Sequence, residues 1–267
     1  MVFVGRDSDV NYGFANWLAA RHELLAYFVA DRARNSWSYR LTRFLRQARR
    51  LGPLRTLDQV GYRVYYLLFE RRLNGILIRD TFRELLGAAL LAKPDVPIYR
   101  FQSLNSQEAL TTLQSLRPDL VFAVCVNEYL SSAFRRIAPR GTYLYHEGLT
   151  PEYMGLHTPF WAIYNGEPEV IGYTLFKVGS RVDAGEPVAQ GTGAIAPKML
   201  RYWVWAGHKA LLDGLPAVEQ ALAALERGEE PRVHRVAGHA RFYSYVGISD
   251  EIRRRVRGAK RAVARKA

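Results

Sequence analysis

The sequence predicts an α/β fold in which a mostly parallel sheet is covered by helices on both faces. Three observations predict it. Short apolar runs alternate with amphipathic stretches, beginning with MVFVG at residues 1–5 and the helical pattern that follows. Residues 33–92 interrupt this alternation with about three helical patterns and no strand pattern. Strand and helix patterns then alternate again as far as residue 192.

The elements follow in order along the chain. A helix over 10–21 and a strand over 24–29 complete an opening β-α-β unit. Strands are predicted over 96–101 and 120–126, with a helix over 106–116 between them. A helix over 131–137, strands over 142–145, 170–178 and 187–192, and one long helix over 199–227 complete the list. Residues 1–247 are therefore expected to form one domain, and residues 248–267 a solvated basic tail.

The net charge of +13 is unevenly distributed. Residues 32–79 contain 12 arginines against Asp58 and Glu70, and residues 251–267 contain eight basic residues against Glu251. The rest of the chain is therefore mildly acidic, which makes a nucleic-acid enzyme the less favoured class. The helices within 33–92 carry apolar stripes opposite their arginines. These stripes either pack on the host domain or contact an anionic membrane surface or polyanion, together with the tail.

Composition limits the other possibilities. With 267 residues and 49% hydrophobic content, the chain can bury one substantial core. Its single cysteine, Cys125, lies in an apolar strand pattern, so neither a disulfide framework nor a multi-cysteine metal site is expected. No apolar run reaches ~18 residues and no signal peptide is recognised. We expect a cytoplasmic protein, peripheral to the membrane if its basic helices bind there, and the sequence does not decide the oligomeric state.

The candidate site lies within residues 141–185. A strand pattern ends at His146, a loop rich in Gly and Pro follows, and a later strand is followed by Asp183. An imidazole and a carboxylate are thus each placed after a strand, where α/β enzymes build their sites. The turn after the first strand lacks the glycine-rich run of a dinucleotide fingerprint or a P-loop.

Here the sequence resembles the folate-dependent formyltransferases, which act on glycinamide ribonucleotide, methionyl-tRNA or nucleotide sugars. The resemblance covers roughly residues 115–192 and rests on a series of short motifs in the family's order. They are Arg117-Pro118-Asp119-Leu120, the strand entering His146, Leu149-Thr150-Pro151, Gly155, Trp161-Ala162, Gly166-Glu167, Gly172-Tyr173-Thr174 and Asp183-Ala184-Gly185. The family's catalytic Asn, two residues before the His, is replaced by Leu144.

The resemblance implies a Rossmann-like fold and 10-formyltetrahydrofolate as the formyl donor. It assigns His146 as general acid/base and oxyanion donor, and Asp183 as the residue that orients it. It places the folate beside Val124, Cys125, Val126 and Gly185. Because a leucine cannot donate a hydrogen bond, a substitute for the missing Asn is expected. The candidates are Glu147, Asn127 and His157, with Ser131 also at a helix start.

The expected function is therefore transfer of a formyl group to the amine of a small biosynthetic substrate, such as an amino sugar. Two alternatives stay open. The same fold can carry a different acyl transfer or a hydrolysis, or the chain can be a catalytically silent scaffold that docks through its basic helices. Fold resemblance by itself does not name the acceptor.

Overall fold

A seven-stranded sheet organises the computed structural model, which describes residues 1–30, 37–126, 128–231, 233 and 239–264. Its strand order is β3-β2-β1-β4-β5-β7-β8. The bounds are β1 Val2–Gly5, β2 Ala26–Ala30, β3 Ile98–Phe101, β4 Leu120–Val124, β5 Gly141–His146, β7 Gly172–Lys177 and β8 Glu186–Thr192. Strands β1 to β5 are parallel, whereas β7 and β8 run antiparallel. The predicted mostly parallel α/β sheet is confirmed.

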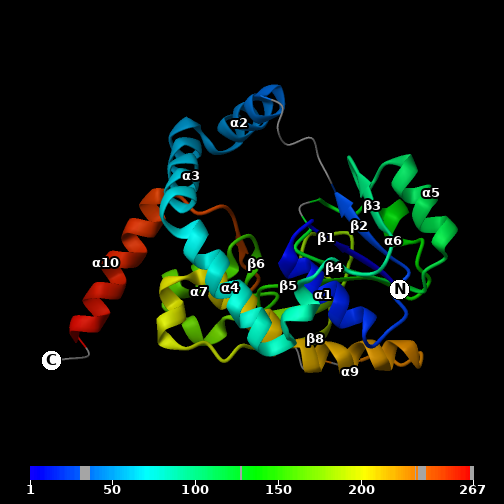
Figure 1. Cartoon of the computed structure of the whole chain (residues 1–267). Helices are drawn as coiled ribbons and strands as arrows, with labels where there is room; N and C mark the ends of the chain where they lie inside the picture. The colour runs from blue at the N-terminus through cyan, green and yellow to red at the C-terminus, as the bar shows by residue number, and fades with distance from the viewer. Residues whose placement is uncertain (31–36, 127, 232, 234–238, 265–267) are drawn as a thin grey trace.

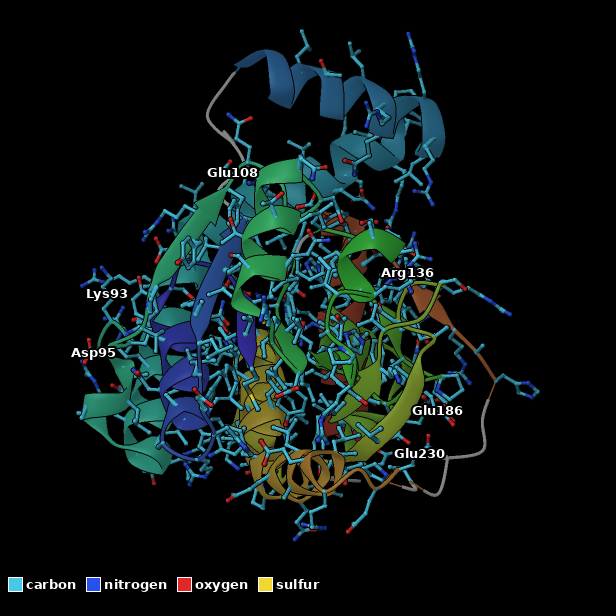
Figure 2. The ribbon with its side chains drawn as sticks, turned by 90° about the vertical axis from the view of Figure 1, so that its right-hand side faces the viewer. Lys93, Asp95, Glu108, Arg136, Glu186 and Glu230 are labelled. Atoms are coloured by element: carbon cyan, nitrogen blue, oxygen red, sulfur yellow. The ribbon has the colours of Figure 1, made fainter. Side chains whose placement is uncertain are left out.

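Helices cover both faces of the sheet (Figure 1). They include α1 Asp9–Ala19, α5 Gln107–Leu116, α6 Ser132–Arg135, α8 Trp203–Asp213 and α9 Leu215–Glu226. Three of them begin with a serine N-cap whose hydroxyl accepts a hydrogen bond from a backbone N–H in the first turn: Ser8, Ser106 and Ser131. Charged side chains point outward around the domain, as Figure 2 shows for Lys93, Asp95, Glu108, Arg136, Glu186 and Glu230.

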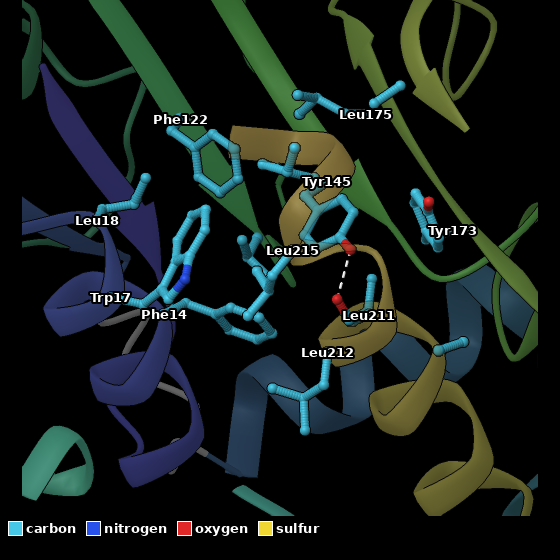
Figure 3. Packing of buried hydrophobic residues seen from close by; sticks show 14 of the residues in the cluster. Phe14, Trp17, Leu18, Phe122, Tyr145, Tyr173, Leu175, Leu211, Leu212 and Leu215 are labelled. Carbon is cyan, nitrogen blue, oxygen red and sulfur yellow. Dashed lines mark hydrogen bonds between the residues drawn. The ribbon is translucent and has the colours of Figure 1, made fainter. Parts of the chain in front are cut away.

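Alternation along the strands divides the core in two. In β1, Phe3 belongs to the larger core, beneath α1, α8 and α9, while Val2 and Val4 belong to the smaller core beneath α5 and α6. Figure 3 shows the larger core, in which the Tyr145 hydroxyl donates a hydrogen bond to the Leu211 carbonyl. Because side chains alternate, neighbouring residues at the end of β5 face different helices.

The sequence predicted one long helix over 199–227, but the structure has two helices there, α8 and α9. A 3₁₀ turn, η4 Pro197–Arg201, precedes α8, and α8 ends before Gly214. A Cβ at Gly214 would overlap the Tyr145 hydroxyl. Pro216 lies in the first turn of α9, where its missing N–H costs nothing. Glycine and proline at this junction thus end one helix and begin the next against the core.

The inserted segment is helical, as predicted. It consists of α2 Trp37–Leu51, α3 Pro53–Tyr65, the π-helix η1 Tyr66–Glu70, α4 Arg71–Leu86 and the 3₁₀ turn η2 Ala88–Leu91. Figure 1 shows α3 and α4 following one another as one long, bent rod, with α2 leaving the top of α3 at an angle. The far end of the rod packs on α1 and α8 through the buried residues Ile78 and Phe82. The near end and α2 stand clear of the sheet (Figures 1 and 2).

The remaining elements follow β5. They are β6 Met154–Gly155, α7 Thr158–Asn165, the 3₁₀ turn η3 Pro168–Val170, β9 Phe242–Tyr243 and α10 Ile248–Ala264. β6 and β9 form a separate two-stranded sheet. The chain beyond residue 248 was expected to be a solvated tail, either a frayed helix or disordered. It is a helix, α10, as far as Ala264, and it packs on α3 and α7. Buried Glu251 accepts hydrogen bonds from buried Arg254, 2.8 Å each, which explains why this basic segment is ordered.

None of the helices in the described part of the chain is both long and apolar enough to cross a bilayer.

Candidate active site

The strand order reverses at the boundary between β1 and β4, because the chain passes from β1 outward to β2 and β3 and then returns to β4. In doubly wound sheets, ligands bind in the crevice beyond the carboxyl ends of the strands at this point. Arg6 directly follows β1, Cys125 follows β4 and Glu147 follows β5. Three polar groups are therefore delivered to one edge of the sheet.

Arg6 ties the first two strand ends together. Its Nε donates a hydrogen bond to the Cys125 carbonyl, 3.0 Å away. Cys125 has a φ of 54°, a left-handed conformation that ends β4 two residues earlier than the sequence predicted. Burial, with the nearby Glu147 charge, raises the pKa of the Cys125 thiol to about 11. Cys125 is thus a neutral thiol and not a reactive thiolate.

Glu147 is the most perturbed carboxyl group of the cluster. Its side chain reaches α8, where one carboxylate oxygen lies 2.8 Å from the position that a Cβ would take on Gly207. Among the described residues, none donates a hydrogen bond to this carboxylate, although the Thr158 hydroxyl donates to the Glu147 backbone carbonyl. Burial raises the pKa of Glu147 to about 7, and the Arg6 charge only partly opposes this effect. Near neutral pH this group can both accept and donate a proton.

Two neutral histidines share the same surroundings. His157 precedes α7 with a φ of 57°, and its ring lies against Trp203, with ring centroids 4.8 Å apart. Burial lowers the pKa of His157 to about 4, and its Nδ1 is buried without a hydrogen-bond partner among the described residues. Burial also lowers the pKa of His208 on α8, whose Nδ1 lies 2.8 Å from the Val204 carbonyl. The Arg6 charge contributes to both shifts.

His146 and Asp183 occupy a different place. His146 Nε2 lies 3.2 Å from the Tyr153 carbonyl, and the ring packs edge-on against Phe176. The Asp183 carboxylate accepts a hydrogen bond of 2.9 Å from the Gly155 N–H. Both residues thus hold the segment 153–155, and in the described structure no hydrogen bond joins them to each other. Their catalytic roles stay predictions.

The six candidates therefore separate by position. His146 points to the same face as Leu144, which packs against the smaller core. Glu147 and His157 lie with Arg6 under α7 and α8, and the Cys125 thiol is close enough to Glu147 for that charge to affect it. Asn127 lies outside the described residues. Ser131 caps α6 by accepting a hydrogen bond from the Phe134 N–H, 3.2 Å away.

The residues expected to bind folate lie on two neighbouring segments. Val124 is fully buried in the larger core, and Val126 packs against the smaller one. Gly185 lies so close to the Lys177 carbonyl that a side chain would overlap it, and it lines an open hollow of ≈ 470 Å³ formed by residues 177–181 and 184–186. The Tyr129 hydroxyl donates to the Ser180 carbonyl, 3.0 Å away, and so joins the segment after β4 to this loop.

Sequence reasoning missed Arg6 and His208. Arg6 directly follows the first strand, so its position at the strand end was a usable signal. His208 lies in the middle of α8, and no sequence motif distinguishes it as a functional residue. In the described part of the chain, no group of His, Cys, Asp and Glu side chains could hold a metal ion.

Comparison with known proteins supports the resemblance at the level of the fold. Residues 80–200 match the family model described as formyl transferase. A 4-N formyltransferase from Francisella tularensis superposes with a TM-score of 0.53 at 13% identity, covering 91% of this chain and 75% of that one. The phosphoribosylglycinamide formyltransferase of Anaplasma phagocytophilum gives 0.52 at 13% identity, covering 90% and 96%. This is a formyltransferase fold.

A third formyltransferase structure agrees with this assignment. The phosphoribosylglycinamide formyltransferase of Streptococcus pneumoniae TIGR4 superposes with a TM-score of 0.50 at 16% identity, covering 83% of this chain and 98% of that one. The matched residues 80–200 include β4, β5 and the loop that carries Glu147 and His157. Cys125, Glu147 and His157 therefore lie within the residues that the family model matches, whereas Arg6 and His208 lie outside them. At these identities the structural likeness establishes the fold, and the reaction has to be argued from the site.

The cluster has the groups that acyl transfer to an amine requires. Glu147 can take a proton from an attacking nitrogen, since its pKa of about 7 matches neutral conditions. His157 is neutral and its buried Nδ1 has no partner among the described residues, so its ring can donate one hydrogen bond without adding positive charge that would repel an ammonium group. The one N–H of the neutral His208 ring is already donated to the Val204 carbonyl. Arg6 supplies the positive potential at the strand ends.

Proposed function

We propose that this protein transfers a formyl group from 10-formyltetrahydrofolate to the amine of a small biosynthetic substrate. The observation that carries the proposal is the position and pKa of Glu147, at the carboxyl end of β5 within the formyltransferase fold. Formyl transfer needs a neutral amine, and a half-buried carboxylate with a pKa of about 7 is suited to deprotonating one.

The residues of the chain have distinct tasks in this proposal. Glu147 accepts the proton that the attacking nitrogen loses and returns it to the nitrogen that leaves. His157, whose buried Nδ1 has no hydrogen-bond partner among the described residues, would donate a hydrogen bond to the developing oxyanion in place of the missing Asn. His146 and Asp183 hold the 153–155 segment that precedes His157 and so position it.

The folate would supply the formyl group. The residues present fit it in their placement, because the segment carrying Cys125 and Val126 is joined by Tyr129 to the loop carrying Gly185. Beside that loop lies an open hollow of ≈ 470 Å³. We assign the folate to this side of the strand ends and the amine to the side of α7 and α8.

An amino sugar is the acceptor class that we favour. The similar structures include both phosphoribosylglycinamide formyltransferases and a sugar N-formyltransferase from Shewanella sp FDAARGOS_354, at a TM-score of 0.50. The turn after β1, Arg6 to Ser8, lacks the glycine-rich loop that would cradle a ribonucleotide phosphate. This difference supports a sugar over a ribonucleotide.

Calorimetric titration with a stable 10-formyltetrahydrofolate analogue tests the donor, and turnover with a panel of nucleotide-linked amino sugars tests the acceptor. We expect micromolar binding of the analogue by the wild type and by Glu147→Gln, and turnover by the wild type only. No binding at millimolar analogue would refute the folate proposal. A hydrolytic reaction would instead release formate without an acceptor.

A further inference from the structure

The first half of the rod, α3 and η1, has an unusual distribution of polar and apolar side chains. The side that faces the body of the protein buries three polar residues, Thr56, Gln59 and Glu70, beside one aromatic residue, Tyr62. Ile78 and Phe82 are buried only in the second half, on α4. The outward side of α3 and η1 exposes a stripe at helical spacing, consisting of Leu54, Leu57, Val60, Val64, Leu67 and Leu68. Their exposure is high, with Leu54 at 83% and Leu68 at 71%. Surface helices of globular proteins have the opposite arrangement.

Hydrogen bonds fix the rod in this orientation. Gln59 Nε2 donates to the Tyr245 carbonyl, 2.9 Å away. Glu70 accepts from the Tyr65 hydroxyl at 2.7 Å and from Arg255 of α10 at 2.9 Å. Rotating the rod to bury its leucines would leave Gln59 and Glu70 without these partners, at a cost of about 1–3 kcal/mol for each buried polar group. The apolar stripe therefore stays on the outside.

Helix α2 extends the same surface. It lies beside α3 and exposes Leu41 at 46% and Leu45 at 49%. Arg46, Arg49 and Arg50 are also exposed on it. Apolar and basic side chains thus alternate over the part of the insertion that stands clear of the sheet (Figure 1). We call the exposed leucines and valines of α2, α3 and η1 the outer stripe.

The charge of this segment favours one kind of partner. Residues 37–72 contain nine arginines and only two acids, Asp58 and Glu70. Both acids are already paired, Asp58 with Arg55 at 2.6 Å and Glu70 with Arg255 at 2.9 Å. A second copy of the chain would bring two strongly basic surfaces together, which Coulomb repulsion opposes. The interface of an anionic lipid bilayer offers negative charge to the arginines and an apolar phase to the exposed leucines and valines.

We propose that the outer stripe binds the interface of an anionic lipid bilayer. The rod would lie in the membrane plane, with its leucines among the acyl chains near the headgroups and its arginines at the level of the lipid phosphates. The rod's far end, packed on α1 and α8, would hold the catalytic body beside the membrane. This proposal does not depend on the reaction that the site catalyses.

Sedimentation with lipid vesicles tests the proposal on the full chain. We expect the wild type to pellet with vesicles that contain phosphatidylglycerol, to stay in solution with pure phosphatidylcholine, and to be released by high salt. Leu54→Ser combined with Leu57→Ser should weaken vesicle binding by roughly a hundredfold, because each inserted leucine is worth about tenfold or more. Both leucines are exposed, so the fold should be retained.

A matched control removes two exposed apolar residues elsewhere, Leu85→Ser with Val182→Ser, which are 49% and 52% exposed. This control should bind vesicles like the wild type. The proposal is overturned if the wild type does not pellet with anionic vesicles at any lipid concentration. It is also overturned if light scattering shows a dimer that only the Leu54/Leu57 variant dissociates, since the stripe would then be a self-association surface.

Discussion

Replacing Glu147 by glutamine should raise stability and abolish catalysis at the same time. The pKa of Glu147 is about 7 in the folded protein and 4.5 as the reference value, so the folded state holds the proton more tightly. Stability from this group is fully present below about pH 4.5 and is lost as the pH rises through about 7. The shift corresponds to about 3 kcal/mol. Glutamine mimics the neutral acid and avoids this loss.

Denaturant unfolding of wild type and Glu147→Gln measures the effect. Between about pH 5 and about pH 8, the stability advantage of the variant should widen by about 2–3 kcal/mol. Formyl transfer should fall by roughly 10²–10⁴-fold if Glu147 is the general base. Glu169→Gln is the control, because Glu169 is exposed and its replacement should change stability by less than about 0.5 kcal/mol at either pH. If the difference in free energy of unfolding between the variant and the wild type did not change with pH, the raised pKa of Glu147 would be refuted.

Three further predictions follow from single contacts. With a thiol pKa of about 11, Cys125 should be alkylated by iodoacetamide at about pH 8 roughly a hundredfold more slowly than in the urea-unfolded chain, and equal rates would contradict its burial. Gly148→Ala places a Cβ against the Tyr153 carbonyl and 2.9 Å from His146 Nε2, so it should lower the free energy of unfolding by about 1–3 kcal/mol, whereas a wild-type value would show that the loop has room. Glu251→Ala leaves Arg254 buried beside α3 and should cost about 3–5 kcal/mol in thermal or chemical denaturation; an unchanged melting temperature would mean that α10 is not held by this pair.

The sheet could be predicted because each of its strands carries a local signal. Parallel strands buried on both faces appear as continuous apolar runs, and β1, β2 and β4 are such runs. The break between α8 and α9 was missed, because Gly214 and Pro216 are tolerated within a helical pattern until the approach of Tyr145 is known. The order of α10 was missed for a similar reason. Its basic residues are held by Glu251 and Glu70, and one of these acids is distant in the sequence.

The sequence indicated the strand ends and loops on which the candidate residues lie, but not which of those residues lie together, and their functional roles stay predictions. Strand ends and loop motifs indicated His146, Glu147 and His157, and all three lie near the carboxyl end of β5. Which of them act together depends on Arg6 and His208, which come from β1 and α8 and meet Glu147 only in the folded chain. The pKa of Glu147 depends on burial beneath these elements, and burial of a loop carboxylate has no local sequence signal.

The alternation of side chains along a β-strand relates Leu144, which replaces the family's Asn, to the position of Glu147. Residues two apart on β5 share a face, so a donor at position 144 and His146 would serve one side of the sheet. Leu144 makes that side apolar, and it packs against the smaller core. A site that shifts by one residue, to Glu147, moves to the opposite face, beneath α7 and α8 and beside Arg6. On this reasoning Leu144→Asn should leave activity nearly unchanged, because the amide would face away from the cluster. A large gain of turnover in that variant would instead place the chemistry on the His146 side.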